Sequence, residues 1–145
     1  MAEHNGGCHC GKVKFTAKDP IISVACNCQR CRKLSGSLHL GVIFSEENFS
    51  VDGELSSYEY IGGSGNRVHS KFCGTCGSKI FSKAELFEGL VSVKLGVLDD
   101  ALDFPPQMEV FTNYKLSWLK DDGCIKESFE EAAVAERLTS ILENL

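Results

Sequence analysis

Seven of the eight cysteines lie in three short groups whose spacing is typical of metal ligands. The last group, Cys73-Gly74-Thr75-Cys76-Gly77, has the form of a zinc knuckle, because two thiolates three residues apart can reach one metal at about 2.3 Å. Gly74 and Gly77 permit the positive φ angles that such a tight turn requires. A redox pair is the alternative for Cys-x-x-Cys, but the five other clustered cysteines favour metal binding.

A closed structural zinc site takes four ligands, whereas catalytic zinc sites commonly have three protein ligands and one open position. Counting therefore favours a division of the cysteines into four and three. The expected structural ligands are the two glycine-flanked pairs, Cys8, Cys10, Cys73 and Cys76. The expected catalytic ligands are Cys26, Cys28 and Cys31. Alternatively, His9 or His39 completes the three-cysteine group and makes it a second structural site.

Three thiolates and one Zn²⁺ carry a net charge of about −1, which weakens Lewis acidity relative to a three-histidine site. Activation of water for hydrolysis is therefore less favoured than binding of an incoming thiol. A thiol that is held as a thiolate beside an aldehyde can attack the carbonyl carbon and form a hemithioacetal.

An anionic thiol would need local positive charge in an acidic chain. Basic residues near the cysteine groups are Arg30, Arg32, Lys33, Arg67 and Lys71. We expect Arg32 to be the first candidate for binding a carboxylate of this co-substrate, because it directly follows Cys31. The histidines that could carry a proton are His9, His39 and His69. The alternative for each of these residues is an ordinary surface or strand side chain without a functional role. Cys124, which belongs to no motif, is expected to be an incidental thiol.

The chain has 145 residues and a net charge of −5, from 15 Lys+Arg and 20 Asp+Glu. This length fits one domain. The acidic balance argues against a nucleic-acid partner, and no apolar run approaches the roughly 18 residues that a membrane helix needs.

Residues 1–7 lack the basic and apolar segments of a secretion signal, so a cytoplasmic location with reduced cysteines is expected. A disulfide framework is the alternative. It is disfavoured because cysteines two apart in a strand, such as Cys26 and Cys28, face opposite sides.

Short alternating runs separated by turn residues predict a mainly β domain of antiparallel strands. The expected strands are 12–18, 21–25, 38–44, 48–51, 55–61, 67–72, 78–82, 90–97 and 108–114. Asp52-Gly53 and residues 62–66 predict hairpin turns. An apolar stripe predicts an amphipathic helix over 130–145, formed by Val134, Leu138, Ile141, Leu142 and Leu145. We expect a zinc-binding domain over 1–128 and a helical segment, 129–145, that packs on it rather than on a partner subunit.

The cysteine groups belong to a longer series of ordered motifs. These are Gly7-Cys8-His9-Cys10-Gly11, Cys26-Asn27-Cys28-Gln29-Arg30-Cys31-Arg32-Lys33, Ser35-Gly36-Ser37, Phe72-Cys73-Gly74-Thr75-Cys76-Gly77, Val97-Leu98-Asp99-Asp100 and Trp118 before Asp121-Asp122-Gly123. Over about residues 5–124 this series resembles the glutathione-dependent formaldehyde-activating enzyme and centromere protein V-like family. The tail from about residue 130 lies beyond the shared pattern.

The resemblance implies a β-tent fold with two zinc ions: a structural one on the four-cysteine set and a catalytic-type one on the three-cysteine set. It further implies a carbon–sulfur lyase-type enzyme that joins glutathione to formaldehyde and so forms S-(hydroxymethyl)glutathione. One alternative is a non-catalytic, zinc-stabilised module that binds a thiol or a partner. Another is a redox enzyme of the methionine sulfoxide reductase B type, for which Cys124 is the only spare thiol.

Overall fold

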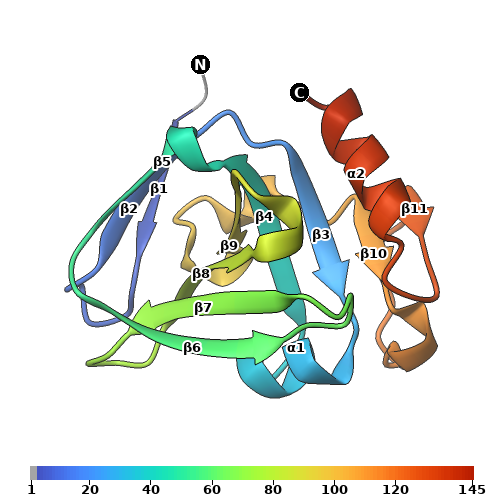
Figure 1. Ribbon diagram of the computed structural model, residues 1–145, viewed down its shortest axis with the longest axis horizontal. Helices are drawn as coiled ribbons and strands as arrows, with labels where there is room; N and C mark the ends of the chain where they lie inside the picture. Colours follow the sequence, from blue (N-terminus) through green and yellow to red (C-terminus); the bar gives the residue numbers. More distant parts are fainter. Residues whose placement is uncertain (1–2) are drawn as a thin grey trace.

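The computed structural model describes residues 3–145 and contains two β-sheets (Figure 1). The small sheet has the order β1-β2-β5, formed by β1 (Glu3–Gly7), β2 (Lys14–Lys18) and β5 (Phe49–Asp52). The large sheet has eight strands in the order β11 (Glu127–Ser128), β10 (Met108–Val110), β3 (Ile22–Cys26), β4 (His39–Ser45), β9 (Leu90–Lys94), β8 (Lys79–Ala84), β7 (Arg67–Cys73) and β6 (Leu55–Ile61). The two α-helices are α1 (Gln29–Ser35) and α2 (Val134–Glu143).

The expectation of a mainly β fold of short antiparallel strands with a C-terminal helix is confirmed. Two pairings depart from it, because β10 runs parallel to both β3 and β11. No helix among residues 3–145 is long and apolar enough to cross a membrane.

The strands separate two hydrophobic cores. In β4, Val42 and Phe44 point into the first core, between the two sheets, whereas Ile43 packs on the opposite side against the second core. This division follows from the two-residue period of a strand, which sends successive side chains to opposite faces. The first core contains Cys8 and Cys73, and the second contains Cys28 with Cys26 and Cys31 packed against it. Each cysteine set therefore borders its own core.

Two elements differ from the sequence-based expectations, and one predicted hairpin turn is observed. Asp52-Gly53 does not close a hairpin, because β5 pairs with β2 in the small sheet while β6 pairs with β7 in the large one. The turn over 62–66 does close the β6–β7 hairpin, with the Gly62 N–H donating to the Asn66 carbonyl at 2.8 Å. Helix α1 was not predicted because none of its residues is buried, so it carries no apolar stripe.

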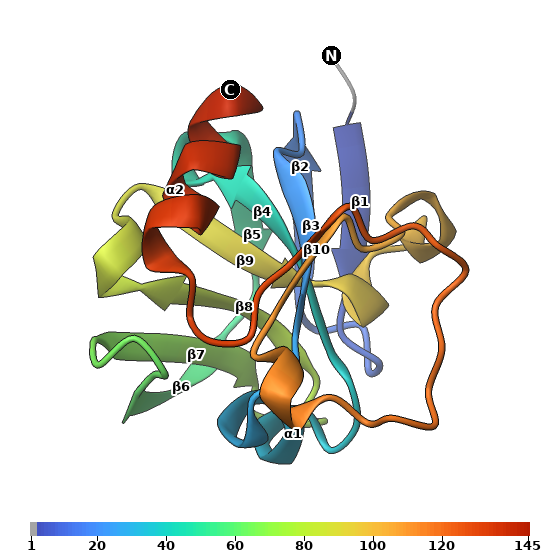
Figure 2. The same cartoon turned by 90° about the vertical axis from the view of Figure 1, so that its right-hand side faces the viewer.

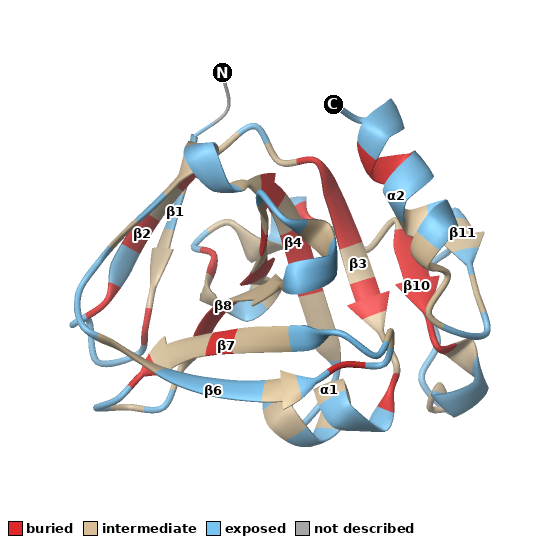
Figure 3. Ribbon diagram, viewed as in Figure 1, coloured by how far each residue is buried: buried red, intermediate tan, exposed pale blue. Residues whose placement is uncertain are grey.

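The C-terminal helix is shorter than the pattern predicts. The chain preceding it runs beside β10, where the Phe129 N–H donates to the Glu109 carbonyl at 3.0 Å, and Figure 2 shows the long connection that leads from β10 to α2. Of the predicted stripe, Ile141 is buried, whereas Leu138, Leu142 and Leu145 are exposed (Figure 3). The helix thus packs on the rest of the chain through one side, which includes the buried Ser140 and Ile141.

Candidate metal centres

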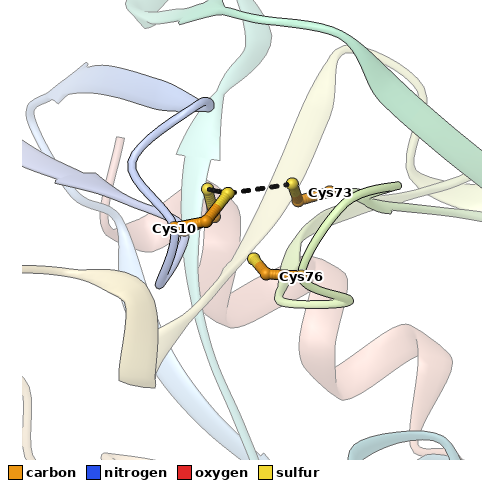
Figure 4. A group of neighbouring side chains, drawn as sticks. Cys10, Cys73 and Cys76 are labelled. Atoms are coloured by element: carbon orange, nitrogen blue, oxygen red, sulfur yellow. Dashed lines mark hydrogen bonds between the residues drawn. The ribbon is translucent and has the colours of Figure 1, made fainter.

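Two turns from different sheets bring four cysteine sulfurs together. Cys8 and Cys10 lie in the turn after β1, Cys73 ends β7, and Cys76 lies in the turn that follows it. All four sulfurs are within 4.8 Å of one another, and Cys10 and Cys73 are 3.8 Å apart (Figure 4). Tetrahedral zinc with Zn–S bonds near 2.3 Å places its sulfurs about 3.8 Å apart. The four-cysteine set therefore fits a closed tetrahedral zinc site.

One backbone group and one hydroxyl contact the sulfurs of the four-cysteine set. The Val13 N–H donates to Cys8 Sγ at 3.3 Å, and the Ser78 hydroxyl lies 3.2 Å from Cys76 Sγ. The hydrogen bond from Ser78 lowers the pKa of Cys76 to about 5, which favours the thiolate that a metal requires. Gly77 has φ +79°, as predicted for this turn. Gly74 does not adopt the positive φ that was expected; a Cβ there would lie 2.6 Å from the Ser56 hydroxyl, so the Ser56 side chain would have to shift.

The second set is built within six consecutive residues. Cys26 ends β3, Cys28 is the N-cap of α1, and Cys31 lies in the first turn of that helix. The sulfurs of Cys26 and Cys28 are 3.5 Å apart, and the Cys31 N–H donates to Cys28 Sγ at 3.4 Å. Asn27 fixes the turn from its side chain, whose amide donates to the Val110 carbonyl at 3.1 Å. Asn27 therefore has a structural contact in this turn.

The charges of the three-cysteine set indicate what it can hold. Hydrogen bonds from Cys26 and Cys31 lower the pKa of Cys28 to about 2, and the neighbouring Cys28 in turn raises the pKa of Cys26 to about 11. Close contact with Cys26 and Cys28 raises the pKa of Cys31 as well. One sulfur can thus carry a negative charge easily and three cannot, unless a cation lies among them. The donor set fits Zn²⁺ with one position left open.

Neither histidine that could have closed this set does so among the described residues. The group of ligand atoms within 4.8 Å of one another contains the three sulfurs and no imidazole. His39 lies opposite Cys26 in the β3–β4 pairing and lines the adjacent cavity. His9 lies beside the other set, where its N–H donates to the Ser78 hydroxyl.

The three-cysteine set opens into a cavity of about 150 Å³. Its apolar wall comes from Val24, Ile43, Phe87, Leu90, Phe111 and Ile141. A second cavity, of about 470 Å³, shares Cys31, His39, Tyr60 and Lys94 with the first. The four-cysteine set, by contrast, contributes no ligand to the lining of either cavity. Only the three-cysteine set is therefore placed to act on a molecule held in these cavities.

Polar side chains at the junction of the two cavities are shifted toward particular protonation states. Burial lowers the pKa of His39 to about 3, so its imidazole is neutral at pH 7 and has one N–H donor. Burial raises the pKa of Tyr60, so its hydroxyl remains a donor. Burial lowers the pKa of Lys94 only to about 8, so its ammonium remains mostly charged at pH 7. The junction thus offers hydrogen-bond donors and one positive charge.

The predicted basic residues are spread over the surface. Arg30 lines the 150 Å³ cavity. Arg32 does not: its guanidinium donates to the Tyr114 carbonyl at 3.4 Å, in a small depression on the other side of Cys26. Lys33 lines a surface hollow beside Trp118, Arg67 forms an ion pair with Glu59, and Lys71 donates to Ser57. The binding of the co-substrate by Arg32 therefore stays a prediction, because Arg32 lines neither the 150 Å³ nor the 470 Å³ cavity.

The remaining candidates are accounted for by local contacts. The His69 ring nitrogens lie 3.1 Å from a Glu59 carboxylate oxygen and 3.0 Å from a Glu85 carboxylate oxygen. Cys124 is half-buried, and its N–H donates to Asp122 in an acidic turn. All eight cysteines are free thiols, so no disulfide is formed.

Sequence reasoning missed two cations in the cavity, Lys94 and Arg137. A signal for Lys94 exists in β9, where Val91 and Val93 alternate with Ser92 and Lys94. This pattern sends the polar pair to the face opposite the first core, which is the cavity face. Arg137 gives no comparable signal, because the fold of the preceding connection decides which face of α2 meets the cavity.

Two comparisons with known proteins agree with this architecture. A crystal structure of a Rhodobacter sphaeroides protein, 17% identical, superposes with a TM-score of 0.52 and covers 86% of this chain and 98% of its own. This likeness concerns the fold alone. The sequence pattern of the family described as "glutathione-dependent formaldehyde-activating enzyme" matches residues 3–114, which include both cysteine sets. The chain therefore belongs to the glutathione-dependent formaldehyde-activating enzyme family.

Proposed function

We propose that the protein joins a thiol, glutathione, to formaldehyde and yields S-(hydroxymethyl)glutathione, as a zinc-dependent carbon–sulfur lyase-type enzyme. The observation that carries the proposal is the three-cysteine set that opens into a cavity, in a chain of this family. In the proposal, Cys26, Cys28 and Cys31 hold a catalytic zinc, and the four-cysteine set holds a structural one. Bound zinc would supply a positive centre that lowers the pKa of an incoming thiol.

The protein side chains would position the two reactants. The apolar wall that includes Val24, Phe111 and Ile141 excludes water from the thiol arm. Tyr60 and His39 lie on the cavity surface with donors that can reach a carbonyl oxygen, and both stay uncharged at pH 7. Such donors stabilise the negative charge that develops on this oxygen when sulfur attacks carbon.

The proposed reaction is balanced without an oxidant or reductant. The thiol loses its proton, its sulfur forms a bond to the carbonyl carbon, and the C=O π bond opens. The oxygen then takes up one proton and becomes the hydroxyl of the hydroxymethyl group. This proton is the one that the thiol gives up, and the Tyr60 hydroxyl can relay it by donating its own proton and accepting another, while neutral His39 can donate a hydrogen bond to the oxygen.

The test is the rate of hydroxymethyl exchange between glutathione and ¹³C-formaldehyde, measured by exchange NMR. This rate separates catalysis from the spontaneous reaction. We expect Cys28→Ser to fall to the uncatalysed rate while its circular dichroism spectrum stays unchanged. The matched control is Cys124→Ser, which removes a thiol outside both sets and should keep full activity.

A folded Cys28→Ser variant with full activity would contradict the proposal. Glutathione binding by the unaltered protein without acceleration of exchange would instead identify a non-catalytic thiol-binding module.

We also propose a cytoplasmic location, which is supported by eight free cysteines. Fractionation of cells followed by immunodetection tests this directly.

A further inference from the structure

The cavity beside the three cysteines has an unusual charge balance. Three cations line it, Arg30, Lys94 and Arg137, and no aspartate or glutamate does so among the described residues. The chain as a whole is acidic, with 20 Asp+Glu against 15 Lys+Arg. Three thiolates around one Zn²⁺ would contribute about −1, which leaves an excess of positive charge. A cavity of this kind favours an anionic occupant.

Lys94 has no carboxylate partner among residues 3–145. Its ammonium has one described hydrogen bond, to the Ser82 hydroxyl at 3.5 Å. Lys115 shows the contrast, because it lies 2.8 Å from Glu109 and 3.6 Å from Asp121. A partly desolvated ammonium with a single long contact retains donors for a ligand.

Arg137 is held in place with most of its donors free. Its Nε donates to the Ala132 carbonyl at 2.7 Å, and its guanidinium lies 5.4 Å from the centre of the Phe87 ring. Neither terminal nitrogen of Arg137 has an ion pair or a hydrogen bond within the described part of the chain. A guanidinium that is fixed by stacking and by one backbone contact is suited to grip a carboxylate with the two remaining nitrogens.

Arg137 comes from a part of the chain outside the family pattern. That pattern ends at residue 114, whereas α2 begins at Val134. Arg137 and Ile141 are four residues apart, lie on the same face of α2, and both line the cavity. The helix therefore completes the cavity with one cation and one apolar side chain that lie beyond the residues matched by the family pattern.

We propose that Arg137 and Lys94 form a carboxylate-binding site for the thiol substrate, and that α2 is thus the element that selects an anionic thiol. This inference rests on the proposed function, because it names the substrate group that the same cavity binds. Glutathione carries two carboxylates and one ammonium at neutral pH, so it meets the requirement. A neutral thiol of equal size does not.

The test uses S-methylglutathione, which retains both carboxylates and has no free thiol, so its binding does not depend on catalysis. We expect isothermal titration calorimetry to show at least about tenfold weaker binding by Arg137→Gln, because a charge-assisted hydrogen bond is lost. Arg137→Lys should recover part of this loss. Lys126→Gln, which removes an exposed positive charge away from the cavity, should bind within about twofold of the unaltered protein.

A second probe separates charge from shape. The diethyl ester of S-methylglutathione lacks both carboxylates, and we expect Arg137→Gln to bind it as the unaltered protein does. Lys94→Met provides an independent variant should Arg137→Gln fail to fold, and it should also weaken binding of S-methylglutathione about tenfold. Equal binding of S-methylglutathione by the unaltered protein and by folded Arg137→Gln or Lys94→Met would overturn the inference. So would a loss confined to Arg32→Gln, or no binding by the unaltered protein.

Different results would contradict the two proposals. If Arg137→Gln still catalyses exchange with an unchanged KM for glutathione, the proposed enzyme function stands and the proposed carboxylate site is wrong. If S-methylglutathione binding depends on Arg137 but the protein does not accelerate exchange, the proposed carboxylate site stands and the proposed enzyme function is wrong.

Discussion

The two cysteine sets use the same ligand atom in opposite structural settings. The four-cysteine set joins the turn after β1 to the end of β7 and the turn that follows it, and Cys10 and Cys73 are 63 positions apart in the sequence. The three-cysteine set lies within one β3–α1 turn and faces a cavity. A metal that closes a long loop stabilises the fold more than one that closes a short turn. The comparison teaches that sets of the same ligand atom can differ in the length of chain that they close and in their access to a cavity, and these two properties separate the structural role from the catalytic role that we propose for them.

The first prediction concerns removal of metal, with the largest expected effect. Dialysis against a strong chelator should first remove the metal of the three-cysteine set, because this set opens into a cavity. Catalysed exchange should therefore disappear before the circular dichroism signal changes. Longer treatment should empty the four-cysteine set and unfold the chain, since structural zinc binding contributes to the free energy of folding.

Simultaneous loss of activity and of folded structure would show that the two sets are equally coupled to the fold. A chelator-resistant fold with no bound zinc would contradict a structural role for the four-cysteine set.

The second prediction compares one ligand from each set. Cys73→Ser should lower the free energy of unfolding by more than about 3 kcal/mol, because the zinc that links both sheets is lost. Cys31→Ser should lower it by less, because only the β3–α1 turn is released. Differential scanning calorimetry of the two variants measures the difference. Equal transition temperatures would remove the distinction between the two settings.

The third prediction concerns the charge that the cavity must accommodate. The folded-state pKa of Lys94 is lowered by burial to about 8, from an ordinary value of 10.5. The folded state therefore disfavours the charged form, and the associated stability is present above pH 10.5 and lost as the pH falls through about 8. At pH 7, Lys94→Met should thus raise the free energy of unfolding, by on the order of 1 kcal/mol.

The difference between Lys94→Met and the unaltered protein should shrink as the pH rises from 8 to 10.5. Urea unfolding at several pH values measures it, and Lys126→Gln serves as the control because its side chain is exposed. A stability of Lys94→Met that is lower at pH 7 than at pH 10 relative to the unaltered protein would contradict the sign.

The sequence allowed the local features of the fold and of the sites to be predicted. Alternation of polar and apolar residues placed β2 and β7 within a few residues, and the expected ranges of β3 and β4 also lie within a few residues of the observed strands. The predicted division into four and three cysteines agrees with the two groups of sulfur atoms that lie close together in the structure. Binding of zinc by these sets remains a prediction.

Features that depend on long-range packing could not be predicted in this way. Asp52-Gly53 has the composition of a hairpin turn, but pairing of β5 with β2 sends the two flanking strands to different sheets. Proximity in sequence favoured Arg32 over Arg137, although the fold brings Arg137 to the cavity from more than 100 residues away. Side chains converge at a cavity through tertiary packing, which leaves little trace in local patterns.

The central claim, one closed and one open zinc site, is tested most directly by the zinc-to-protein ratio. It can be measured by inductively coupled plasma mass spectrometry on folded protein. We predict two zinc ions per chain for the unaltered protein and one for Cys28→Ser, with unchanged circular dichroism. A ratio of one in the unaltered protein, or of two in Cys28→Ser, would contradict the account.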